Sequence, residues 1–307
     1  MNLLTKKLTL NDVVLQPFND KTNPEILMLK LFNETSFKIS QVITSSYSTS
    51  FSNAVRLLDR EIKEAIYSIY GFVRVSDEIV DSFHSFNKKK LLEEFERDYY
   101  EARNNGISLN PVLNSFQITV SKYGIPDNLI QAFLNSMKID LVKHDHKTQS
   151  ETEVYIYGSA EVVGLMCLRV FVLGNENLYN ELEISARKLG SAFQKVNFLR
   201  DIKDDTELLN RQYFHKSIES GFTDTVKNDI VDDVKKEFAE SFQGIKKLPG
   251  NSKIGVLTAY YYYKKLLKKI ELTPAEELLG KRVRIPDLMK ILLLLKAYFK
   301  CKLRLLN

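Results

Sequence analysis

Turn-forming residues are scarce in this chain, and this scarcity constrains its fold more than any other feature. The 307 residues include 12 glycines and 7 prolines, both below the roughly 7% and 5% usual for soluble proteins. Alternating strand patterns are essentially absent, whereas apolar residues recur at helical spacing over 50–83, 151–173 and 181–210. We therefore predict an all-α fold, a single large helical bundle with a shared core.

No internal repeat, low-complexity tract or Gly/Ser-rich linker divides the chain. Residues 1–24 include two prolines and are predicted to form an irregular N-terminal arm, followed by one helical domain over residues 25–307. Within the domain, Asn33–Ser36 has the composition of a helix cap or turn. Pro286 is expected to open the last helix from its first turn.

The chain has no sign of export or of membrane insertion. Two cysteines, Cys167 and Cys301, exclude a disulfide framework, and the N-terminal residues lack the apolar segment of a signal peptide. The longest aliphatic run, Ile291–Leu295, lies between two lysines, so no bilayer-spanning segment is expected. These features predict a cytoplasmic protein.

Positive charge is concentrated at the C-terminal end. The formal net charge is +5, and residues 281–307 hold eight basic residues and one acid, a net +7 that leaves −2 for residues 1–280. The body therefore lacks the basicity typical of nucleic-acid binding, and no nucleic-acid partner is expected. The basic, leucine-rich segment Pro286–Leu306 favours peripheral membrane contact or an acidic partner. The alternative is that its apolar face packs on the bundle.

Two stripes of oxygen ligands occur in strongly apolar helical stretches. Asp77 and Asp81 are four residues apart and share a helical face with Arg74. The second stripe repeats at intervals of about one turn and consists of Gln194, Asn197, Asp201 and Asp205, with Arg200 beside it. Carboxylate and amide oxygens suit Mg²⁺, with Mn²⁺ as an alternative, and Mg²⁺ often bridges protein carboxylates to phosphate.

Acidic pairs at this spacing are also common on solvated helix faces. The same spacing relates Asp229 to Asp233 and Glu94 to Asp98, and the charged neighbours of both pairs predict surface positions. The two selected stripes differ in their arginines and apolar flanks. Facing each other, they would clamp a metal-bound diphosphate, with arginine making bidentate contacts and the apolar core holding a hydrocarbon tail.

Several motifs in order along the chain resemble the squalene/phytoene synthase family. The first is Asp77-Glu-Ile-Val-Asp81, similar to the DELVD form, and the second is Asn197-Phe-Leu-Arg200-Asp201-Ile-Lys-Asp-Asp205, similar to NxxRDxxxD. The others are Tyr47-Ser-Thr-Ser-Phe51-Ser-Asn-Ala-Val-Arg56, Ser136-Met-Lys-Ile-Asp140-Leu141, Tyr155-Ile-Tyr-Gly-Ser-Ala160-Glu-Val-Val163-Gly164, Arg211-Gln-Tyr213 and Ala259–Ile270 with Tyr263.

The resemblance implies an isoprenoid synthase type of bundle with a central active-site cavity. It also implies head-to-head condensation of two geranylgeranyl diphosphates, through a cyclopropylcarbinyl diphosphate, to phytoene, the first committed step of carotenoid biosynthesis. Asp77, Asp81, Asp201 and Asp205 would hold Mg²⁺ together with Asn197. No NADPH is expected.

The same resemblance assigns the other site residues. Tyr70 and Tyr155 are candidates for stabilising the cation or managing a proton. The residues expected to bind substrate are Ser48, Ser50, Phe51, Arg74, Val163, Gly164, Gln194, Asn197, Arg200, Arg211, Tyr213 and Tyr263.

Other interpretations of these residues remain open. Ser48 and Ser50 would also serve as helix N-caps, and the aromatic residues as plain core. His144 and His146 have an HxH spacing but lie in a polar loop, so a metal role there is not favoured. Glu161 departs from the family's glycine and adds a carboxylate near the expected pocket wall, and His215 departs from its proline.

Two alternative functions also remain. A squalene or dehydrosqualene type of synthase would use farnesyl diphosphate with the same chemistry. A non-catalytic helical scaffold would keep the fold, and loss of a motif aspartate would mark it; all four aspartates are present.

Overall fold

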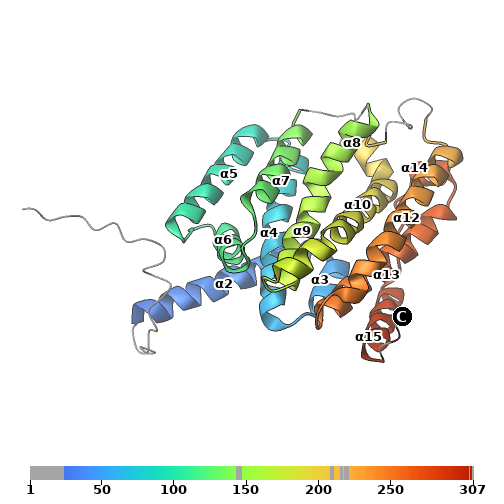
Figure 1. Ribbon diagram of the computed structural model, residues 1–307. Helices are drawn as coiled ribbons and strands as arrows, with labels where there is room; N and C mark the ends of the chain where they lie inside the picture. Colours follow the sequence, from blue (N-terminus) through green and yellow to red (C-terminus); the bar gives the residue numbers. More distant parts are fainter. Residues whose placement is uncertain are drawn as a thin grey trace, which may run out of the picture.

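The computed structural model describes residues 24–142, 147–207, 211–214, 217, 221–303 and 305. Every regular element in these ranges is helical, and the helices pack side by side into one bundle (Figure 1), so the all-α prediction is confirmed. In chain order they are α2 (Pro24–Tyr47), α3 (Thr49–Val55), α4 (Arg60–Asp81), α5 (Lys88–Asn105), α6 (Pro111–Tyr123), α7 (Asp127–Asp140), α8 (Gln149–Ile156), the single π-helical turn η1 (Tyr157–Glu161), α9 (Val162–Phe171), α10 (Glu176–Glu207), α12 (Asp224–Lys247), α13 (Ser252–Glu271), α14 (Ala275–Gly280) and α15 (Asp287–Lys302).

Buried side chains form two large hydrophobic clusters. The first joins α4 to α5, α6, α7 and α9, and Phe72 stacks on Phe116 there with ring centroids 4.0 Å apart. The second joins α10 to α12, α13 and α15, and includes an edge-on pair of Phe238 and Tyr260 at 5.4 Å. Side chains from both clusters line one cavity, so the cavity lies between the two clusters.

The predicted break at Asn33–Ser36 is wrong, because α2 runs through it without interruption. The polar side chains there accept hydrogen bonds from a neighbouring helix. Asn114 of α6 donates to Asn33 Oδ1 at 2.9 Å and to Ser36 Oγ at 3.2 Å. A helix cap and a buried interhelical hydrogen bond use the same side chains, and composition alone does not separate them.

One continuous helical stretch, Gln149–Phe171, is long and apolar enough to cross a membrane by length and composition, with a mean hydropathy of 1.4 in its most apolar window. The expectation that no such stretch exists is therefore wrong. That expectation rested on continuous aliphatic runs, and in this helix aromatic and small residues interrupt such runs. The stretch packs against α7 and α10, and it lines the cavity, as a core helix does.

The last helix, α15, begins after Pro286, which is the N-cap and lies outside the first turn where it was expected. Its inner face is buried at Leu293 and Ala297 and packs against α13. Its outer face leaves a stripe of apolar side chains in solvent, at Leu288, Ile291, Leu292, Leu295 and Phe299. The packing interpretation therefore holds for one face of the helix only.

Candidate active site

The cavity has a volume of about 1180 Å³ and collects the residues that the motifs single out. It is lined by residues of α3, α4, α7, α8, η1, α9, α10, α12 and α13, together with α15 and the segment that leads into it. The predicted site residues that line it are Ser48, Ser50, Phe51, Tyr70, Arg74, Asp77, Asp81, Tyr155, Val163, Gly164, Gln194, Asn197, Arg200, Asp201, Asp205, Arg211, Tyr213 and Tyr263.

The first carboxylate pair lies in the last two turns of α4. Burial raises the pKa of Asp77 to about 8, and the neighbouring carboxylate of Asp81 adds to the rise. Arg74, one turn earlier, pairs with Glu78 and lies over the ring of Tyr47, 4.3 Å from its centroid. Ionisation of Asp77 is therefore costly in its protein surroundings.

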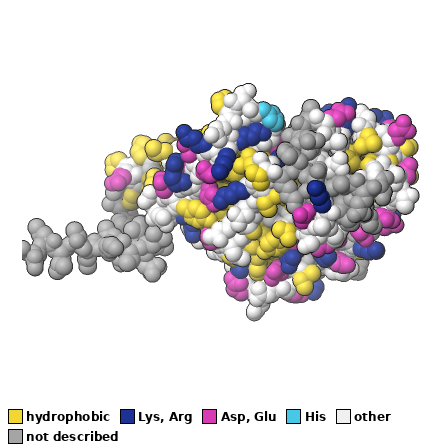
Figure 2. Space-filling view, turned by 90° about the horizontal axis from the view of Figure 1, so that it is seen from above, with side chains coloured by type: hydrophobic (Ala, Val, Ile, Leu, Met, Phe, Trp, Pro, Cys, Tyr) yellow, Lys and Arg dark blue, Asp and Glu magenta, His cyan; other side chains and the backbone are white. Residues whose placement is uncertain are grey.

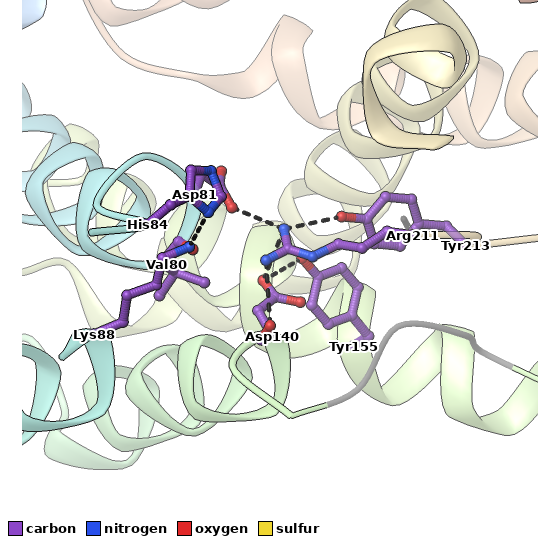
Figure 3. A network of polar contacts seen from close by, with 8 residues as sticks. All are labelled: Val80, Asp81, His84, Lys88, Asp140, Tyr155, Arg211 and Tyr213. Atoms are coloured by element: carbon purple, nitrogen blue, oxygen red, sulfur yellow. Dashed lines mark hydrogen bonds and ion pairs between the residues drawn. The ribbon is translucent and has the colours of Figure 1, made fainter. Parts of the chain in front are cut away.

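Arg211 connects this pair to two other elements (Figure 3). Its Nη1 donates to Asp81 Oδ1 at 2.8 Å, and its Nη2 donates to the main-chain oxygen of Asp140 at 3.2 Å. Tyr155 donates its hydroxyl to Asp140 Oδ2 at 2.7 Å, and its ring stacks on that of Tyr213, with centroids 5.3 Å apart. One buried guanidinium thus joins the end of α4 to the end of α7 and to the segment after α10.

The second carboxylate pair lies in the last two turns of α10. Asp201 accepts from Arg200 Nε at 2.8 Å and from Arg282 Nη2 at 3.2 Å. Burial raises the pKa of Asp205 to about 8, with Asp201 as the next contribution and Asp81 as a further one. All four aspartates line the same cavity, so the ends of α4 and α10 lie at one site, where Asp81 also contributes to the raised pKa of Asp205.

The control pairs behave as surface groups. The side chains of Glu94 and Asp98 are 39% and 44% exposed, against 19% for Asp201. Asp229 and Asp233 are exposed on α12. Spacing is the same in all four pairs. The side chain of Asp81 is 35% exposed, close to that of Glu94, so the two motif pairs differ from the two surface pairs chiefly in lining the cavity.

Aromatic side chains line the cavity beside the carboxylates. Tyr70 stacks on Phe51 with centroids 4.8 Å apart, and burial raises the pKa of its hydroxyl to about 12. Tyr263 stacks on Phe193 at 4.0 Å and donates to Asn197 Oδ1 at 3.1 Å. Both rings also line the cavity, where an aromatic face can stabilise a cation.

Ser48 fits both of its sequence interpretations. It is the N-cap of α3 and accepts from the backbone N–H of Phe51 at 3.4 Å, and it also lines the cavity. Ser50 lies in the first turn of α3 and lines the cavity as well, without being the cap. The cap fixes the start of α3, which places Phe51 against Tyr70.

Glu161 was expected near the pocket wall, and that expectation is wrong. Its carboxylate accepts from Arg187 Nε of α10 at 2.7 Å, and it does not line the cavity. The π-helical turn that ends at Glu161 turns its side chain toward α10. The backbones are close there, since a Cβ on Gly190 would lie 2.8 Å from the carbonyl oxygen of Ala160.

Asp140 and Arg282 are cavity residues that pair with predicted site residues and were not themselves singled out from the sequence. Asp140 was noted only as part of a turn motif, and Arg282 only as part of the C-terminal segment. Their signal is three-dimensional, because Asp140 reaches Arg211 and Tyr155, and Arg282 reaches Asp201. His144, His146 and His215 lie outside the described residues.

The donor set fits divalent cations of the Mg²⁺ type. Such an ion uses one or two protein carboxylates and completes its shell with water and phosphate oxygens. Within the described ranges no three acidic, histidine or cysteine side chains converge on one point, which agrees with two separate carboxylate pairs on facing helices. Asp77 and Asp205 carry raised pKa values there, so a cation between the helices would relieve the cost of their charge.

Comparison with known proteins identifies the family. The sequence profile of squalene/phytoene synthases matches residues 44–288. Phytoene synthase 2 of Oryza sativa subsp. japonica is 27% identical over 281 residues, covering 83% of this chain and 68% of that protein. Phytoene synthase of Arthrospira platensis is 23% identical over 292 residues, covering 87% and 94%.

Solved structures share the fold. A dehydrosqualene synthase in complex with ligand superposes with a TM-score of 0.74 at 19% identity, over 88% of this chain and 98% of that one. Squalene synthase HpnC from Alicyclobacillus acidocaldarius gives a TM-score of 0.67 at 18% identity, over 82% and 97%. Profile, ordered motifs and fold agree, and the chain belongs to the squalene/phytoene synthase family.

Proposed function

We propose that this protein condenses two geranylgeranyl diphosphates head to head to give phytoene, in the first committed step of carotenoid biosynthesis. One observation supports this above the others. Two carboxylate pairs, flanked by arginines, line one cavity of about 1180 Å³ whose remaining lining is largely apolar. That arrangement suits a molecule with a diphosphate at one end and a long hydrocarbon at the other.

In this proposal Asp77 and Asp81 hold Mg²⁺ on one side and Asp201 and Asp205 on the other, with Asn197 beside them. Bound Mg²⁺ supplies charge neutralisation of the diphosphate as the C1–O bond breaks. Arg74, Arg200 and Arg211 supply guanidinium groups to phosphate oxygens, which their planar geometry contacts in a bidentate way. The main supporting feature is that all three arginines line the cavity.

The chemistry needs no reductant. The donor loses diphosphate, the 2,3-alkene of the acceptor attacks the allylic cation, and loss of a proton closes a cyclopropylcarbinyl diphosphate. This intermediate loses the second diphosphate, rearranges to the 1–1′ linkage and loses a final proton. The apolar walls exclude water from the cations, the rings of Tyr70, Phe51 and Tyr263 face them, and Tyr155 is placed to manage a proton. NADPH is not required.

The preference for geranylgeranyl diphosphate draws on the similar curated proteins, which are phytoene synthases of plants and bacteria. The alternative is farnesyl diphosphate, giving squalene or dehydrosqualene, the products named for the similar solved structures. A non-catalytic scaffold is disfavoured because both carboxylate pairs are intact and line the cavity.

Product analysis tests the proposal. Purified protein is incubated with Mg²⁺ and either geranylgeranyl or farnesyl diphosphate, with and without NADPH, and the organic phase is identified by mass. A C40 hydrocarbon formed without NADPH is expected. A C30 product from farnesyl diphosphate alone moves the assignment to the squalene branch. Absence of both product and diphosphate release favours the scaffold.

We also propose a cytoplasmic location with peripheral membrane contact through α15. Its outer stripe of apolar side chains is exposed, with Leu288 71% exposed, and Lys296 and Lys302 lie nearby on the same helix. Basic and acidic side chains are interspersed on the face seen in Figure 2, so that face lacks the broad basic surface that nucleic acid would need. Flotation with anionic vesicles is the test, and failure of the intact protein to float would contradict it.

A further inference from the structure

Arg211 lies between two carboxylates and is itself almost inaccessible, with 6% of its surface exposed. Its Nη1 is 2.8 Å from Asp81 Oδ1 and 4.0 Å from Asp140 Oδ2. In this conformation the closer bond goes to Asp81, which is one of the four aspartates assigned to the metal. A cation that binds Asp81 must therefore compete with a buried guanidinium.

Competition of this kind is costly unless the guanidinium keeps a counter-charge. A buried ion whose partner is removed is left uncompensated, which is strongly unfavourable. Arg211 cannot turn to bulk water, since it is enclosed by α4, by the end of α7 and by Tyr213. The group on the other side of Arg211 therefore determines the free-energy cost of separating Arg211 from Asp81.

Asp140 lies at that other side. It is 6% exposed and lines the cavity, and its Oδ2 accepts from Tyr155 at 2.7 Å. Its Oδ1 is buried and has no hydrogen-bond partner within the described part of the chain. Oδ2, the oxygen that Tyr155 fixes, is also the one nearest Arg211, at 4.0 Å from Nη1, so a short shift of the guanidinium would bring it within hydrogen-bond distance (Figure 3).

We propose that Asp140 is a positioning residue that retains Arg211 when a divalent cation takes Asp81. The inference rests on the divalent-cation site of the proposed function. With Asp140 ionised, Arg211 moves from one carboxylate to another over a short distance and never becomes an unpaired buried charge. Without that charge, Asp81 is the remaining carboxylate within 4 Å of Arg211 among the described residues, and the metal must break the pair outright.

Substitution of Asp140 by asparagine is the sharpest test. D140N keeps the side-chain shape and an oxygen that accepts from Tyr155, and it removes only the charge. The matched control is E237Q, which neutralises another buried carboxylate that accepts from Ser191 at 2.9 Å and from Lys195 at 2.8 Å and does not line the cavity. Both variants disturb a buried ion pair, and only D140N touches Arg211.

The experiment measures binding of Mn²⁺ alone, without pyrophosphate, whose oxygens would give Arg211 another partner; the readout is the electron paramagnetic resonance signal of free Mn²⁺ on the full chain. We expect D140N to weaken Mn²⁺ binding about tenfold, the effect of a pairing change near 1.4 kcal/mol, while E237Q binds as the unsubstituted protein does. Equal binding by D140N and the unsubstituted protein would overturn the inference. Failure of the unsubstituted protein to bind Mn²⁺ would instead count against the proposed function.

A second variant keeps the inference testable if D140N does not fold. R211Q removes the competing cation, and D140N/R211Q then lacks both members of the buried pair. If Asp140 acts through Arg211, the double variant binds Mn²⁺ as tightly as R211Q. If the double variant binds tenfold more weakly than R211Q, Asp140 acts on the metal directly and the positioning role is wrong.

Discussion

Asp81 on α4 lies close enough to Asp205 on α10 to raise the pKa of that residue, although the two are separated by more than a hundred positions in sequence. Burial is the larger cause, and Asp201 adds to it. The fold therefore makes ionisation of these carboxyl groups costly in the absence of a cation, at the place where a metal-bound diphosphate is proposed to lie.

The metal-free protein should lose stability as the pH rises from about 5 to about 8. Asp77 and Asp205 have a pKa near 3.8 when unfolded and about 8 when folded, so in this window the unfolded state releases a proton that the folded state retains. Each group lowers the free energy of unfolding by up to about 1.4 kcal/mol per pH unit. Thermal unfolding in chelator at several pH values measures this slope.

D205N should flatten that slope, because the amide does not titrate, and Mg²⁺ with pyrophosphate should do the same in the unsubstituted protein. D98N is the control, since Asp98 is a half-exposed member of a surface pair. A slope that is unchanged in D205N would show that other groups cause the pH dependence.

Neutralising either carboxylate pair should abolish most turnover without unfolding the protein. We expect D77N and D205N each to lower the rate of product formation by about 100-fold or more, since a metal supplies several kcal/mol of charge stabilisation and each 1.36 kcal/mol is tenfold. The measurement is product formed per minute at saturating Mg²⁺. The control is D233N, since Asp233 belongs to an exposed pair on α12. A comparable loss of turnover in D233N would contradict the assignment.

Substitution of Gly190 by alanine should destabilise the bundle by about 1–3 kcal/mol. Its Cβ would lie 2.8 Å from the Ala160 carbonyl oxygen, where α10 approaches the π-helical turn. Gly280, in the last turn of α14, has nothing within 4 Å of such a Cβ. G280A should therefore be neutral or stabilising by up to about 1 kcal/mol, and urea unfolding of the two variants compares them directly.

Polar substitutions on the outer face of α15 should lower vesicle binding and leave the melting temperature unchanged. Leu288, Leu292 and Leu295 are 71%, 50% and 42% exposed, so L288Q/L292Q/L295Q removes apolar surface that the bundle does not use. L293Q is the contrasting variant because Leu293 is buried, and it should lower the melting temperature. Unchanged flotation of the triple variant would exclude α15 as the membrane contact.

The all-helical fold and the positions of the two carboxylate stripes were predictable from periodicity. Asp77 and Asp81, or Asp201 and Asp205, share a helix face by spacing alone. Their burial was not predictable from spacing, because Glu94 and Asp98 have the same spacing and lie at the surface. Apolar flanks carried that information.

The spacing of apolar and polar residues does not predict interactions between distant segments. Asn33 and Ser36 have the composition of a turn and instead bind Asn114 across a helix interface. Glu161 was expected at the cavity and instead pairs with Arg187, because a π-helical turn rotates it. In each case a long-range partner overrides a local preference.

The cavity lined by both hydrophobic clusters has a consequence for what counts as the interior of this protein. A solid core would join α4 and its neighbours to α10 and its neighbours with side chains of the chain itself. Here the two clusters touch at their edges and border the cavity, so under the proposed function bound hydrocarbon chains would fill the space that remains between them. In that proposal, substrate binding completes the packing around the cavity in each turnover, and product release removes it again.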